Sequence, residues 1–104
     1  MTDLDPHVHQ PTRLRILMLL SGVDSADFSF LLGTLGLTKG NLSSHMARLE
    51  EAGYVEVSKI FAGKIPNTSY VLTKKGRASL EKYWRAIDDI RLAGGSATGP
   101  ARKR

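Results

Sequence analysis

The 104-residue sequence predicts a mainly helical α+β domain that carries one small β-hairpin. Through most of the chain apolar residues recur at spacings of three and four, as Leu42, Met46 and Leu49 do, which predicts helices with one buried side. Over residues 54–72 the pattern changes to alternating apolar and polar residues with turn-forming residues between them, which predicts two paired strands. The length suits a single hydrophobic core, so we expect one domain.

The first elements are expected to be a turn and a long apolar helix. Asp5 and Pro6 form the pattern of a helix start, with an N-cap and a proline at the first helical position, and a short turn to His9 follows. Pro11 opens a helix that is apolar on nearly all sides and that Gly22 ends. A helix of this kind must be covered on more than one face.

Two further helices are expected before the hairpin. A very short strand at residues 26–28 precedes a helix that Ser29 can cap and that Gly36 ends. Thr38 is a good N-cap for the next helix, at about residues 39–52, whose apolar residues define one buried stripe. The two helices are therefore joined by a tight turn.

The hairpin and a last helix complete the domain. Residues 54–61 alternate as a half-buried strand does, with Val55 and Val57 on one side, residues 62–68 form the turn, and residues 69–72 form the return strand. Thr73 caps the last helix, which carries a wide apolar stripe of Leu80, Tyr83, Trp84, Ile87 and Ile90. We expect the domain to cover residues 1–93 and residues 94–104 to be a disordered basic tail, because they have nothing to bury.

Three segments carry a resemblance to a known family. The element order is that of the winged helix-turn-helix, in which two short helices brace a third so that its outer face projects. The run LTKGNLSSHMARLEEAGYV at residues 37–55 resembles the recognition-helix segment of MarR/ArsR-like regulators. Residues 11–20 are similar to the first long helix of the small single-domain members, and residues 72–77 resemble the segment that opens their last helix.

The resemblance implies a homodimeric transcriptional regulator that places the third helix of each subunit in a DNA major groove. The chain is too short for all the extra helices of full-length MarR proteins, and it lacks the cysteines that metal-sensing ArsR proteins usually use. The resemblance therefore implies DNA binding and leaves open whether a small-molecule effector exists.

The charge distribution points to the same partner. The net charge is +5, and residues 38–77 hold seven Lys or Arg against three Glu, a local charge of +4. A basic segment in the middle of the chain favours a polyanion such as double-stranded DNA. The first residues lack a signal-peptide pattern and no apolar run reaches the length of a membrane span, so a cytoplasmic protein without a membrane partner is expected.

The residues expected to contact DNA lie mainly on the third helix. If its apolar stripe faces inward, the opposite face is one stripe of donors suited to reading bases in a major groove: Asn41, Ser44, His45 and Arg48. A second group is expected on the DNA backbone, from the start of that helix, from the wing at about residues 59–68 and from the last helix: Thr38, Lys39, Gly40, Ser43, Lys59, Lys64, Asn67 and Lys74. A generic polar helix face is usually only solvated, but this one lacks acidic residues until Glu50, which favours contact with phosphate.

The apolar first and last helices are expected to form a dimer interface, because a domain this small covers only part of their surface. The residues assigned to it are Leu17, Leu20, Leu80, Tyr83, Trp84, Ile87 and Ile90. The two aromatic residues are the expected anchors.

Other function classes find little support in the sequence. The three histidines are joined by no cysteine or acidic cluster, so no metal site or other cofactor is expected. The sequence shows no nucleophile–base pair and no phosphate-binding glycine loop, so an enzyme is not expected. The alternative kept open is a winged-helix module that binds another protein without specific DNA binding, since one fold serves several functions.

Overall fold

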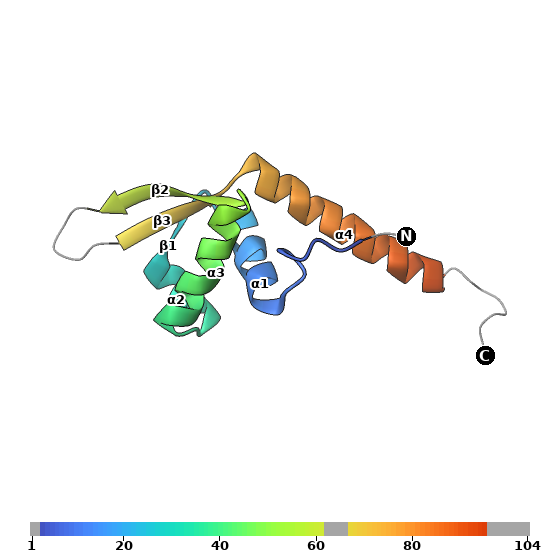
Figure 1. Cartoon of the computed structure of the whole chain (residues 1–104), viewed down its shortest axis with the longest axis horizontal. Coiled ribbons are helices and arrows are strands. Elements are labelled where there is room, and N and C mark those ends of the chain that lie inside the picture. The colour runs from blue at the N-terminus through green and yellow to red at the C-terminus, as the bar shows by residue number, and fades with distance from the viewer. Residues whose placement is uncertain (1–2, 62–66, 96–104) are drawn as a thin grey trace.

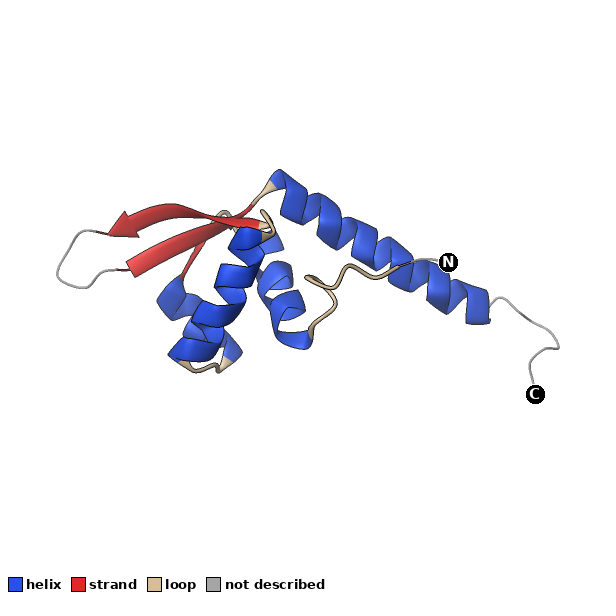
Figure 2. Cartoon of the chain, in the orientation of Figure 1, coloured by secondary structure: helices blue, strands red, loops and turns tan. Residues whose placement is uncertain are grey.

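Four helices and a three-stranded antiparallel sheet make up the part of the chain that the computed structural model describes, residues 3–61 and 67–95. The elements follow the order α1 (Pro11–Ser21), β1 (Ala26–Asp27), α2 (Phe28–Leu35), α3 (Lys39–Glu51), β2 (Val55–Phe61), β3 (Asn67–Leu72) and α4 (Lys74–Gly95) (Figures 1 and 2). The predicted mainly helical α+β fold is confirmed.

The sheet has the strand order β1-β3-β2, so the short strand before α2 pairs with the far strand of the hairpin. Ala26 lies opposite Tyr70, and the β2–β3 register shifts between Val57 and Lys59, which leaves Ser58 as an extra residue in β2. Val55 is buried as expected, but Val57 is 38% exposed because the hairpin projects beyond the helices toward its turn (Figure 1).

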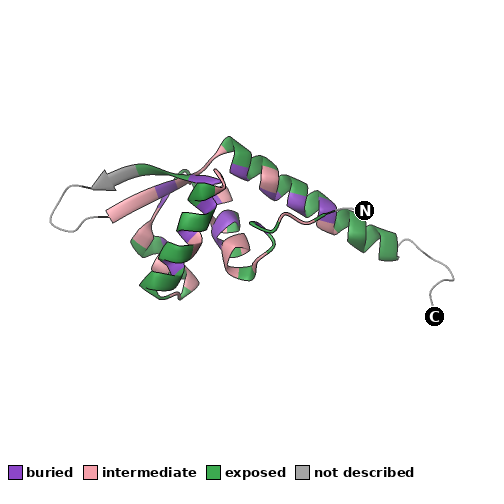
Figure 3. Ribbon diagram, in the orientation of Figure 1, coloured by how far each residue is buried: buried purple, intermediate pink, exposed green. Residues whose placement is uncertain are grey.

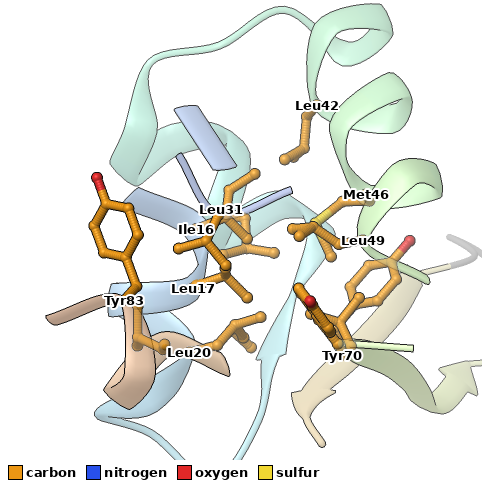
Figure 4. Packing of buried hydrophobic residues seen from close by; sticks show 14 residues of the cluster. Ile16, Leu17, Leu20, Leu31, Leu42, Met46, Leu49, Tyr70 and Tyr83 are labelled. Atoms are coloured by element: carbon orange, nitrogen blue, oxygen red, sulfur yellow. The ribbon is translucent and has the colours of Figure 1, made fainter. Parts of the chain in front are cut away.

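The hydrophobic core lies between α1 and the elements packed around it. Buried side chains of α1, α2 and α3 meet in the centre, and β3 and α4 close the core from the other sides (Figures 3 and 4). The largest fully buried side chains are Val8, Ile16, Leu17, Leu20, Leu31, Leu42, Met46, Leu49 and Val55. α1 is thus the central helix, which explains why it is apolar on most of its surface.

Two helix starts differ in how well the sequence predicted them. Thr38 caps α3 as expected, since its hydroxyl accepts a hydrogen bond from the Asn41 amide at 3.2 Å. The prediction for α2 was wrong by two residues: Asp27, not Ser29, is the N-cap, and its carboxylate accepts from the Phe30 amide at 2.7 Å. The pairing of β1 with β3 ends at Asp27, so the chain turns into the helix there.

The start of α4 is held tightly against the segment that links α3 to β2. The Thr73 hydroxyl donates to the Gly53 carbonyl at 2.6 Å and accepts from the Gly76 amide at 2.9 Å, which confirms Thr73 as the cap. The helix backbone comes so close to this segment that a Cβ built on Gly76 would lie 2.1 Å from the Tyr54 carbonyl oxygen. A glycine is therefore required here by space.

The bounds of the last two elements also differ from the expected ones. β3 begins at Asn67, two residues before the predicted return strand, because residues 67 and 68 still pair with β2. α4 continues through Gly95, two residues into the segment expected to be a tail. The rest of that segment lies outside the described residues.

The segment before α1 packs onto the domain as a turn and not as a helix. The Asp5 carbonyl accepts from the Val8 and His9 amides, and its carboxylate accepts from the His7 amide at 2.8 Å and from the Tyr54 hydroxyl. Partial burial raises the pKa of Asp5, but these hydrogen bonds outweigh it, so the pKa lies below its ordinary value. The ionised carboxylate thus ties the segment to the residue that precedes β2.

Candidate nucleic-acid interface

α3 is positioned by three side chains on its inner face. Leu42, Met46 and Leu49 are completely buried and fix the rotation of the helix against α1 and α2 (Figure 4). These residues are at the spacings of four and three that the sequence predicted. The rotation of α3 therefore leaves the predicted reading face on the outside.

The outer face of α3 is polar and uncovered. Its exposed residues are Lys39, Gly40, Asn41, Ser43, Ser44, Ala47 and Arg48 (Figure 3). The first acidic residue after the cap is Glu50, in the last turn. The capping residue Thr38 is exposed as well, and apart from the adjacent residues and the helix backbone no described atom lies within 4 Å of where a Cβ on Gly40 would be. Three of the four residues predicted to read bases are thus exposed to solvent. Five residues predicted to contact the DNA backbone are exposed too, four of them at the start of α3 and one at the start of α4: Thr38, Lys39, Gly40, Ser43 and Lys74.

His45, the fourth predicted base-reading residue, is only half-exposed. Its Nδ1 lies 3.3 Å from an Nη atom of Arg13, which reaches α3 from the first turn of α1. Partial burial and the positive charges of Arg13 and Arg48 together lower the pKa of His45 from its ordinary value. The ring is therefore neutral at pH 7.

Arg13 belongs to this site although no sequence pattern indicated it. Its Nε donates to the His7 carbonyl at 2.8 Å and an Nη donates to the Pro6 carbonyl at 3.2 Å. Burial and the nearby Arg48 lower its pKa, and a guanidinium stays charged in proteins. Arg13 and His45 are 32 residues apart, and no local pattern links them.

The wing is described only in part. Lys64 lies outside the described residues, and of Lys59 the structure describes the backbone alone, which pairs with Ser69 in the sheet. Asn67 is half-buried at the start of β3. Their predicted contacts with DNA remain predictions.

The basic residues at the start of α4 have different surroundings. Lys74 is exposed, whereas the Nζ of Lys75 lies 5.8 Å from the centre of the Tyr54 ring and Arg77 makes a long hydrogen bond of 3.5 Å to the Ser21 carbonyl. Part of the positive charge at this helix start is therefore engaged by the domain itself. Lys74 is the member of the group best placed to meet a phosphate.

The predicted dimer interface needs correction. Leu17 and Leu20 are buried in the core of the same chain and are therefore not available to a second copy. Leu80 and Tyr83 are also buried, since α4 packs this part of its stripe on α1, and the Tyr83 hydroxyl lies 2.9 Å from Nδ1 of His9.

The second half of α4 keeps an uncovered apolar surface. Trp84 is 39% exposed, Ile90 is 52% exposed, and Ile87 is half-buried between them. Leu92, which was not among the predicted interface residues, is 53% exposed. This half of the helix projects beyond the rest of the domain (Figure 1).

Metal sites and membrane spans find no support in the described part of the chain. Among the residues that the structure describes, no three His, Cys, Asp or Glu side chains come together as metal ligands would. Within the same ranges, no helix combines the length and the hydropathy needed to cross a bilayer.

Comparisons with known proteins identify similar sequences over most of the chain. The sequence model of a family described as "winged helix DNA-binding domain" matches residues 12–90. An uncharacterised protein of Methanocaldococcus jannaschii is 40% identical over 72 residues, which are 68% of this chain and 77% of that protein.

Solved structures share the fold. A transcriptional regulator homologue from Pyrococcus horikoshii has a TM-score of 0.77 and 28% identity, over 84% of this chain and 86% of its own. A MarR family transcriptional regulator from Streptomyces coelicolor, solved in complex with DNA, has a TM-score of 0.69 and 22% identity, over 93% of this chain and 65% of its own. At this identity, the similarity to the Streptomyces coelicolor regulator shows a common fold alone.

Proposed function

Because the chain belongs to the winged helix DNA-binding domain family, we propose that it is a sequence-specific transcriptional regulator that binds double-stranded DNA as a homodimer. In this proposal α3 enters the major groove, and the wing at about residues 59–68 lies on the backbone or in the minor groove. The family is described by DNA binding and not by a catalysed reaction, so the proposal includes no enzyme activity.

The observation that carries the proposal is the outer face of α3. Arg48 and Asn41 are exposed on it and have the geometry for bidentate bonds to guanine and adenine, respectively. At its start, the exposed Lys39, Gly40 and Ser43 are suited to phosphate, because the first amides of a helix carry partial positive charge and Gly40 leaves open space. No carboxylate lies on α3 before Glu50, so the approach of the DNA meets no repulsion from this part of the helix.

The second half of α4 supports the homodimer. A helix of 22 residues is about 33 Å long, and its end projects from the domain with Trp84, Ile90 and Leu92 exposed. Apolar residues grouped on a projecting helix are suited to the same helix of a second copy. A two-fold dimer then predicts a pseudo-palindromic operator with half-sites about 10 base pairs apart.

The proposal is tested by selecting bound sequences from random duplex DNA at moderate salt and then measuring affinity for the enriched duplex. Arg48→Ala is expected to cost about 1–3 kcal/mol on that duplex and to relax the sequence preference. Arg15→Ala, which removes the same charge from an exposed position of α1, is expected to change all duplexes alike.

Two results would contradict this function. If no duplex is enriched, sequence-specific binding is refuted. If in addition another protein co-purifies with the chain, the alternative of a protein-interaction module is favoured. The affinity of such a module for its partner would fall only weakly with salt, whereas the affinity of a protein that contacts phosphates falls steeply.

A further inference from the structure

The contact between Arg13 and His45 joins the central helix to the reading face of α3. An Nη atom of Arg13 lies 3.3 Å from Nδ1 of His45, while Nε and the other Nη of the same guanidinium bond to the His7 and Pro6 carbonyls. The guanidinium is therefore held in place from three sides. It is the one hydrogen-bond partner of the His45 ring within the described residues.

The chemistry of this pair decides the tautomer of His45. A guanidinium has five N–H donors and no acceptor, so in this contact Nδ1 of His45 must accept. A neutral imidazole that accepts at Nδ1 carries its hydrogen on Nε2. The contact of His9 differs: the Tyr83 hydroxyl beside Nδ1 of His9 either donates or accepts, so that bond selects no tautomer.

We propose that Arg13 is a positioning residue that fixes His45 as the Nε2–H tautomer, so that the reading face presents a hydrogen-bond donor at this position. The inference rests on the proposed function, in which this face lies against bases. A donor selects an acceptor, and in the major groove the acceptors are N7 of a purine, O6 of guanine and O4 of thymine. His45 in this state disfavours the amino groups of cytosine and adenine.

The charges around His45 favour the same state. Partial burial lowers the pKa of His45, and the positive charges of Arg13 from α1 and Arg48 from α3 lower it further. Protonation of Nδ1 would set an N–H donor against the guanidinium and break the contact. His45 therefore acts on DNA as a neutral donor and not as a cation that attracts phosphate.

The tautomer is tested first in the free protein. Long-range proton–nitrogen NMR of the imidazole rings, recorded over a pH series, reports the tautomer and the pKa of each histidine. His45 is expected to be Nε2–H above neutral pH and to titrate below the ordinary histidine pKa of about 6.5. In Arg13→Met the pKa of His45 is expected to rise and the Nε2–H fraction to fall, while Arg15→Met leaves both unchanged.

A neutral His45 ring that carries its hydrogen on Nδ1 in the wild-type protein, at a pH above its pKa, would overturn the proposal, and this result needs no variant. An unchanged pKa and tautomer in Arg13→Met would overturn it as well. Arg13→Met also removes the hydrogen bonds to the His7 and Pro6 carbonyls, so loosening of the N-terminal segment must be detected separately. Signals of His7 and His9 report it, and Arg13→Lys, which keeps a positively charged group with N–H donors and no acceptor, is expected to restore the tautomer.

The role on DNA is tested by a double-mutant cycle on the selected duplex. Arg13→Met is expected to weaken binding about tenfold in the wild-type background and less than about twofold when His45 is already alanine, because a positioning residue acts through its partner. Equal losses in both backgrounds would show an independent phosphate contact and overturn the proposal. If no duplex is selected at all, the proposed function fails, whereas an Nδ1–H tautomer in a protein that selects DNA refutes the inference alone.

Discussion

Gly76→Ala tests how closely α4 must approach the start of the β-hairpin. The alanine Cβ would lie 2.1 Å from the Tyr54 carbonyl oxygen and 2.8 Å from a methyl group of Leu72. The oxygen belongs to the backbone and accepts a hydrogen bond from the Thr73 amide at 3.0 Å. It therefore has no free side-chain rotation by which to move away, and moving it strains the bond that starts α4.

The magnitude follows from three contributions. A non-bonded carbon and oxygen need about 3.2 Å or more, so the backbones must separate by about 1 Å, and overpacking of this kind costs roughly 1–3 kcal/mol or more. The hydrogen bond of Thr73 contributes about 1 kcal/mol more if it is lost. The better helix propensity of alanine offsets up to about 1 kcal/mol, so we expect a net destabilisation of about 1–3 kcal/mol.

The assay is urea or thermal unfolding followed by circular dichroism, with Gly33→Ala as the matched control. Gly33 is also inside a helix, α2, but apart from the adjacent residues and the helix backbone no described atom lies within 4 Å of the position that its Cβ would take, so alanine there is expected to stabilise by about 0.5–1 kcal/mol. The two substitutions should thus change the free energy of unfolding in opposite directions, and the Tm of Gly76→Ala should fall by roughly 4 °C or more. A Gly76→Ala protein as stable as wild type would refute the close approach.

Three further substitutions test other contacts. Thr38→Ala removes the cap of α3 and is expected to cost about 1 kcal/mol in unfolding free energy, whereas Thr34→Ala, at an exposed helical position, should change it by less than about 0.5 kcal/mol; equal effects would contradict the capping role. Asp5 has a lowered pKa when folded, so its carboxylate contributes stability above its unfolded pKa of about 3.9 and loses it as the pH falls through the folded pKa. The stability difference between wild type and Asp5→Asn, measured by urea unfolding, should therefore shrink below about pH 4, and a difference that is constant with pH would exclude this linkage. Trp84→Ala is expected to raise the dissociation constant of the proposed dimer at least about tenfold in sedimentation equilibrium; an unchanged constant would remove Trp84 from the proposed interface.

The elements that the sequence predicted well are those set by local signals. α3 has its cap, its inward stripe and its terminating glycine within one continuous segment, so its bounds and rotation could be read directly. The start of α2 was predicted at Ser29, which is the wrong residue, since Asp27 is of an equally good capping type and is the cap in the structure. The choice between them depends on strand pairing with β3, more than 40 residues further along the chain.

The parts that could not be predicted depend on how distant segments pack. Periodicity shows that α1 is apolar on most sides, but not that its own domain covers Leu17 and Leu20. In the same way it groups Tyr83 with Trp84, although only Tyr83 is buried. The contact of Arg13 with His45 arises from the crossing of α1 and α3, and the sequence carries no spacing that would indicate it.

Whether α3 reads DNA is decided by an amide chemical-shift titration of the nitrogen-15-labelled protein with the selected duplex. The largest changes are expected along the exposed face of α3, from Lys39 to Arg48, with little change at the exposed Met18 of α1. Saturation at a simple protein-to-duplex ratio with this pattern would support α3 as the reading helix. Binding that leaves the amides of α3 unchanged and perturbs another surface would contradict it.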